Sequence, residues 1–122
     1  MADAKTTEKK AAVHKARFDS ADETHPFGRG KAEVVNLGGV KVGRTTHEPG
    51  WRWSQDIKPR AKTDRCEAQH VGYIVQGRFR IVGRDGSEEE ISAGDTFVIP
   101  PGHDAWTVGN EKVILLEFKA FS

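Results

Sequence analysis

The pattern of apolar and polar positions divides the chain near residue 31. From Lys31 onward, apolar residues occur in short runs separated by glycine, which is typical of β-strands joined by tight turns. Residues 32–37 are mostly apolar, and residues 40–45 alternate with a period of two. Further runs of this kind follow at residues 71–75, 79–82, 97–99, 105–108 and 113–118. Short strands at this spacing, with no helical pattern among them, predict an all-β sandwich or barrel of antiparallel strands.

The first residues have a different composition. Residues 1–20 are rich in Ala, Lys and Glu, and no Gly or Pro precedes Pro26. We therefore predict an N-terminal arm over residues 1–30, helical or disordered, followed by a barrel over residues 31–122. The arm is either a frayed terminal helix or a segment that packs on a partner subunit.

Two local patterns refine the prediction for the barrel. Trp51 and Trp53 alternate with polar residues, which places both indoles on one face of a strand. Residues 54–65 are polar and contain Pro59, so we expect mainly a loop there, with a strand starting near its end. Asp85-Gly86 predicts a tight hairpin in which both central residues have positive φ.

Composition narrows the classes of function. The formal net charge is only +1, whereas non-specific nucleic-acid binding needs a basic face. No apolar run approaches the ~18 residues of a membrane span, and the N-terminus lacks the apolar core of a signal peptide. A single cysteine, Cys66, excludes an intrachain disulfide and fits a reducing compartment. We expect a cytoplasmic protein that binds neither nucleic acid nor membrane.

Two segments carry a family resemblance. The run from Gly94 through Pro100-Pro101-Gly102 to His103, together with the run from Gly72 to Phe79 around Gly77, resembles the paired motifs of the cupin family. The surrounding residues, 48–54 and 100–106, are similar to those of small single-domain bacterial cupins. The resemblance covers roughly residues 31–119 and implies a double-stranded β-helix, or jelly-roll barrel, whose interior often holds a metal ion.

The resemblance also implies where metal ligands would lie. The family usually binds its metal through three histidines and one glutamate. In this chain Asp64 and Cys66 stand at the His-x-His positions, His70 stands at the glutamate position, and Ala105 stands at the last histidine position. His103 precedes Ala105 by two residues, so both side chains can point to the same face of a strand.

Cys66, His70 and His103 are therefore the candidate ligands, with Asp64 as the fourth. A thiolate with two imidazoles favours zinc over magnesium or calcium, and iron or nickel are the alternatives. The competing interpretation is structural: Cys66 is a small buried side chain, and the histidines are hydrogen-bonded residues of the barrel.

Aromatic residues indicate a pocket. If Trp51 and Trp53 face inward, they form the wall of a substrate pocket; otherwise they are ordinary core residues. His47 lies at a strand end and either reaches the barrel mouth or is a surface histidine. His47 and Asp104 are the candidates for an acid or base near the metal. Tyr73, opposite in parity to His70, is expected in an outer layer or a dimer contact.

These features leave several functions open. One is a metal-dependent enzyme of the isomerase, dioxygenase or decarboxylase type that acts on a small polar or anionic molecule. The alternatives are a non-catalytic sensor or binding module for such a ligand and a barrel that serves only dimerisation. Edge strands need cover, and cupins commonly pair, so a homodimer is expected.

Overall fold

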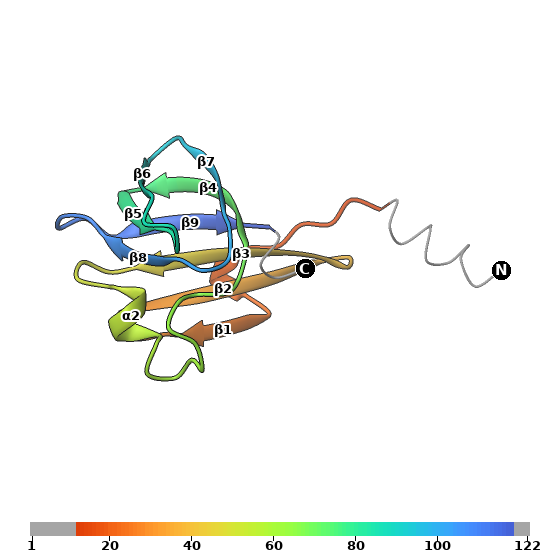
Figure 1. Ribbon diagram of the computed structural model, residues 1–122. Helices are drawn as coiled ribbons and strands as arrows, with labels where there is room; N and C mark the ends of the chain where they lie inside the picture. Colours follow the sequence, from red (N-terminus) through yellow and green to blue (C-terminus); the bar gives the residue numbers. More distant parts are fainter. Residues whose placement is uncertain (1–11, 119–122) are drawn as a thin grey trace.

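The computed structural model describes residues 12–118, which form two antiparallel sheets (Figure 1). One sheet has six strands in the order β1-β2-β3-β9-β4-β7, and the other has three in the order β6-β5-β8. The strands are β1 (Glu23–Pro26), β2 (Gly30–Leu37), β3 (Val40–His47), β4 (His70–Gln76), β5 (Arg78–Val82), β6 (Glu88–Ser92), β7 (Thr96–Ile99), β8 (Asp104–Thr107) and β9 (Val113–Glu117). The predicted all-β, jelly-roll class is confirmed.

The core lies between the sheets because apolar residues alternate along the strands. Ile74 and Leu115 come from the six-stranded sheet and pack with Phe79 and Ala105 of the three-stranded one. In β9 every second residue is buried, beginning with Val113. This period-two burial leaves one face of each strand available to line the interior.

The N-terminal region differs from the predicted arm. Residues 1–11, where most of the expected helix falls, lie outside the described residues. The first elements are a short 3₁₀ turn, η1 (Phe18–Ser20), and then β1, which pairs with β2 from Glu23↔Val34 to Pro26↔Lys31. The sheet therefore begins before Lys31. All four side chains of β1 are exposed, so its sequence carries no apolar alternation, and its edge position tolerates Pro26.

The segment with the two tryptophans is not a strand. Trp53 begins a one-turn helix, α2 (Trp53–Asp56), and Arg52 forms an isolated bridge to Trp106 of β8. Carboxylates replace strand pairing here: Asp56 accepts the Arg52 N–H at 2.9 Å, and Asp104 accepts the Ser54 N–H at 3.1 Å.

The hairpin between β5 and β6 is present, but its turn is longer than predicted. Of the two central residues, only Gly86 has a positive φ, at 85°. The Asp85 carboxylate instead accepts the Ser87 N–H at 3.0 Å and the Ser87 hydroxyl at 2.6 Å. This local side-chain turn removes the need for positive φ at residue 85.

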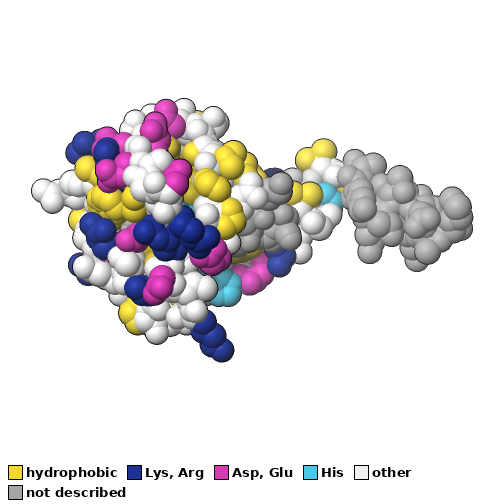
Figure 2. Space-filling view, in the orientation of Figure 1, with side chains coloured by type: hydrophobic (Ala, Val, Ile, Leu, Met, Phe, Trp, Pro, Cys, Tyr) yellow, Lys and Arg dark blue, Asp and Glu magenta, His cyan; other side chains and the backbone are white. Residues whose placement is uncertain are grey.

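The surface mixes both signs of charge. Figure 2 shows lysine and arginine side chains interspersed with aspartate and glutamate on the face in view. Apolar side chains also reach the surface, among them Tyr73 and Val75 of β4 and Val98 of β7. Among the described residues, no helix has the length and apolar character needed to cross a membrane.

Candidate metal centre

The backbone holds Cys66 and His103 side by side. The Cys66 N–H donates to the His103 carbonyl at 2.8 Å, and the Gly102 N–H donates to the Cys66 carbonyl at 2.7 Å. Gly102 has a φ of 92°, which only glycine adopts without strain, and this turns the chain after Pro100-Pro101. The proline-rich loop thus brings His103 to a residue 37 positions earlier, although no regular strand contains Cys66.

His70 is the first residue of β4, and its two ring nitrogens contact Glu117 and Cys66. Its Nδ1 lies 2.5 Å from Oε1 of Glu117 on β9, and its Nε2 lies 3.5 Å from the Cys66 sulfur. A carboxylate has no proton to give, so Nδ1–H is the donor to Glu117. Nε2 is consequently the nitrogen that His70 turns toward Cys66.

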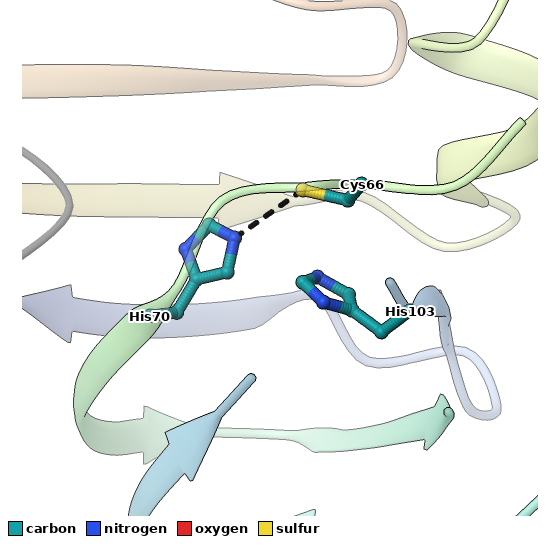
Figure 3. A group of neighbouring side chains, drawn as sticks. All are labelled: Cys66, His70 and His103. Carbon is teal, nitrogen blue, oxygen red and sulfur yellow. Dashed lines mark hydrogen bonds between the residues drawn. The ribbon is translucent and has the colours of Figure 1, made fainter. Parts of the chain in front are cut away.

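The three donor atoms converge (Figure 3). The His103 Nδ1–H donates to the Pro100 carbonyl at 2.8 Å, so its Nε2 is the nitrogen left for a ligand. The His70 and His103 rings lie 5.1 Å apart, and the donor atoms of Cys66, His70 and His103 all lie within 4.8 Å of one another. Bonds of about 2.0–2.3 Å to a tetrahedral ion place ligand atoms about 3.5 Å apart. The three donor atoms would therefore bind one ion after moving about 1 Å closer together.

Electrostatics favour a thiolate beside a charged imidazole. Burial opposes charge on the Cys66 sulfur, but the neighbouring His103 and His70 imidazoles outweigh it and lower the pKa of the thiol to about 6. Burial likewise opposes charge on His70, but Cys66 and Glu117 outweigh it and raise the pKa of the imidazole to about 10. At neutral pH the sulfur is therefore in the form that binds metal, and an incoming cation would displace a proton from His70.

The sequence interpretation did not include Glu117, which belongs to this site. The residue is 3 % exposed, and its carboxylate accepts hydrogen bonds from His70 and from the Thr45 hydroxyl, the latter at 3.2 Å. A carboxylate that orients a ligating histidine is a common partner of metal ligands. The signal was available, because Glu117 shares the inward parity of Val113 and Leu115 in an apolar run.

The structure does not bring Asp64 to the other three candidates. Its side chain is 94 % exposed and pairs with the Lys58 ammonium at 3.3 Å. The parity argument for Asp64 required a continuous strand through Cys66 to His70, whereas these residues precede β4 in an irregular segment.

A cavity of about 340 Å³ adjoins the three donors. Trp51 and Trp53 are buried and line it, although they do so from a turn and a helix instead of a strand. His47 is also in its wall and is buried, so it is not a surface histidine. The remaining lining residues are His25, Phe27, Ala32, Thr45, Ile57, Cys66, His70, Phe79, Ile99, His103, Ala105, Leu115 and Glu117.

Of the two candidates for an acid or base, only His47 lies in this wall. Asp104 instead accepts the N–H groups of Ser54 and Ala105 and lies 3.7 Å from the Arg52 guanidinium. Its carboxylate stabilises the start of α2 and is absent from the cavity lining.

A sequence profile identifies the family. The profile of the cupin domain matches residues 54–119, which is more than half of the chain and includes Cys66, His70, His103 and Glu117. The chain belongs to the cupin family. No curated protein matches it at a significant level.

Solved structures agree with this cupin fold. An RmlC-like cupin from Shewanella frigidimarina is 19% identical, with a TM-score of 0.58, over 91% of this chain and 97% of that one. An oxalate decarboxylase from B. subtilis is 16% identical, with a TM-score of 0.62, over 88% of this chain and 29% of its own. The polyketide cyclase RemF from Streptomyces resistomycificus is 15% identical, with a TM-score of 0.61, over 87% and 78%. At these identities the likeness shows the fold alone.

Proposed function

We propose that this cupin binds a divalent transition-metal ion through Cys66, His70 and His103 and uses it to act on a small molecule in the adjoining cavity. The observation that carries the proposal is the convergence of one sulfur and two imidazole nitrogens within 4.8 Å at the cavity wall. The mixture of thiolate and imidazole favours zinc, with iron and nickel as alternatives.

Three protein ligands favour an enzyme over a purely structural site. Structural zinc sites are closed by four protein ligands, whereas catalytic sites keep a position open for water or substrate. Such an ion polarises a carbonyl group or activates a bound water molecule. Glu117 would hold His70 in the orientation and tautomer that direct Nε2 to the ion, and Trp51 and Trp53 would exclude water from the cavity.

The decarboxylase and the cyclase among the structural relatives show that the fold hosts enzymes, and we propose an isomerase, dioxygenase or decarboxylase type of reaction here. The alternative is a sensor, which would use the same ion and cavity to bind a ligand without turnover.

The proposed metal site also favours a cytoplasmic location. Cys66 is a free cysteine with a lowered pKa, and it can bind a metal ion only while its thiol stays reduced, as it does in a reducing compartment.

Metal analysis of the purified full chain tests the first step. After growth with added zinc, iron and nickel, we expect about one metal ion per chain, and little in Cys66→Ala or His103→Gln. Asp64→Ala is the matched control, because the exposed carboxylate lies outside the cluster and its loss should leave the stoichiometry unchanged. Metal-free wild-type protein, or equal metal in all four proteins, would show that the proposal is wrong.

A ligand screen separates the enzyme from the sensor. A metabolite library is tested by thermal shift on the metal-loaded protein, where a ligand at about 100 times its Kd stabilises the fold by about 2.7 kcal/mol. Turnover of a hit that is lost in Cys66→Ala indicates an enzyme, and saturable binding without turnover indicates a sensor.

A further inference from the structure

A chain of hydrogen bonds runs from the candidate metal site to His47. Glu117 Oε2 accepts from the Thr45 hydroxyl at 3.2 Å, and Thr45 Oγ1 lies 3.2 Å from His47 Nε2. Since the Thr45 proton is used on Glu117, the Thr45 oxygen accepts from His47. His47 therefore carries its proton on Nε2, and its Nδ1 is a lone-pair acceptor.

That acceptor has no partner. Among the described residues, His47 Nδ1 is the one buried side-chain nitrogen or oxygen without a hydrogen bond. A buried acceptor without a hydrogen bond destabilises the folded protein. This acceptor belongs to a residue that lines the cavity, so a bound ligand could supply the missing donor. Burial, reinforced by the charge on His70, lowers the pKa of His47 to about 3, so the ring stays neutral and Nδ1 does not fill its lone pair with a proton.

Aromatic rings surround His47. The ring centroids of Phe27, Trp51 and Phe79 lie 5.4, 4.3 and 4.8 Å from that of His47. Trp51 and Phe79 are buried, whereas Phe27 is only partly buried, so Phe27 is the least confined of the three rings around His47. None of the described residues that line the cavity is Lys or Arg, and the charged His70 imidazole is already paired with Glu117 and with the Cys66 sulfur.

We propose that His47 Nδ1 selects the ligand, and that the cavity takes a flat, mainly apolar molecule that carries an N–H or O–H donor for this nitrogen. The inference rests on the proposed function in one respect, namely that the cavity is the ligand site. It gives the ligand an aromatic or similarly apolar body, in place of the small polar or anionic molecule expected from the sequence, and it gives His47 a role in specificity.

Indole and benzofuran test the role of the donor. The two molecules have nearly the same shape, but the N–H donor of indole is replaced in benzofuran by an oxygen that cannot donate. We expect wild-type protein to bind indole about tenfold more tightly, since one hydrogen bond to an otherwise unsatisfied acceptor has about that effect. Dissociation constants come from ligand-observed NMR titrations with each probe.

Matched variants assign the preference to His47. His47→Phe keeps an aromatic ring but removes the acceptor, so the two probes should bind with equal affinity. The control is His25→Phe, which replaces an exposed histidine that also lines the cavity, and this variant should keep the tenfold preference. Should His47→Phe fail to fold, nitrogen chemical shifts on the wild-type protein decide: indole, and not benzofuran, should shift the His47 Nδ1 resonance.

The inference and the proposed function can fail separately, because metal content is measured on the same samples. Protein that binds metal but holds both probes equally overturns the role of His47 and leaves the metal site intact. Metal-free protein that still prefers indole supports His47 and contradicts the metal proposal. Failure of both probes to bind at millimolar concentration overturns the inference.

Discussion

His70 and Glu117 lie 47 residues apart in the sequence, yet His70 Nδ1 lies 2.5 Å from Glu117 Oε1 in the interior of the barrel. Strands β4 and β9 are neighbours in the six-stranded sheet, and this pairing brings the two side chains together. The contact leaves His70 Nε2 directed at Cys66, which is the orientation a metal ligand requires.

Glu117→Gln should therefore weaken metal binding without removing any ligand. We expect a 10–100-fold loss of zinc affinity, the usual cost of losing a partner of a ligating histidine. Competition with a fluorescent chelator gives the affinity. Glu111→Gln, an exposed residue that precedes β9, is the control and should bind zinc like wild type. Unchanged affinity in Glu117→Gln would show that the carboxylate does not support the site.

Cys66 should react as a thiolate well below the pH at which cysteine ordinarily does. The rate of alkylation by iodoacetamide in metal-free protein should rise with a midpoint near pH 6, in place of the ordinary value of 9.0. Because the folded pKa is lowered, the associated stability is present in full above pH 9 and is lost as pH falls through 6. Bound zinc should suppress the reaction, and a midpoint near 9 would contradict the electrostatics of the site.

His47 should make the protein sensitive to acid. Its folded pKa is about 3, whereas the unfolded value is 6.5, so only the unfolded chain takes up this proton between those values. Unfolding therefore becomes easier as pH falls below 6.5, by up to about 1.4 kcal/mol per pH unit. Urea denaturation of metal-free protein between pH 7 and 4.5 should show a shallower decline in His47→Gln than in wild type. An equal decline in both would mean that His47 is protonated in the folded state.

Adjacent residues of β4 should differ sharply in their effect on stability. Ile74 is 0% exposed, so Ile74→Ala should lower the free energy of unfolding by about 2–5 kcal/mol through lost burial and the cavity left behind. Val75 points outward and is 45% exposed, so Val75→Ala should change it by less than about 1 kcal/mol. Equal effects in urea denaturation would contradict the inward and outward alternation of β4.

The outer face of β4 and β7 is the surface on which we predict a homodimer. Tyr73, Val75 and Val98 are exposed there, and β7 is an edge strand. Light scattering at micromolar concentration should give twice the 13.5 kDa chain mass, and Val98→Asp should give a single chain. A monomeric wild-type protein would refute this prediction.

Local patterns in the sequence determined the fold class. Period-two alternation and glycine-marked turns depend on neighbouring residues, so β4, β7 and β9 could be located without knowing what they pack against. The spacing of Gly77, Gly94 and Gly102 led to the cupin family for the same reason. The short β1 and the helix α2 were missed because tertiary pairing and carboxylate contacts, not apolar alternation, hold them in place.

The site could be predicted only in part. Motif spacing selected Cys66, His70 and His103, and the structure brings these three together. It left Asp64 in solvent and put Glu117 and Thr45 beside His70 and His47, because those contacts form between strands that are distant in the sequence. A sequence shows which face of a strand a residue occupies. The packing of the two sheets around the core decides which strands lie next to one another, and hence which side chains form hydrogen bonds.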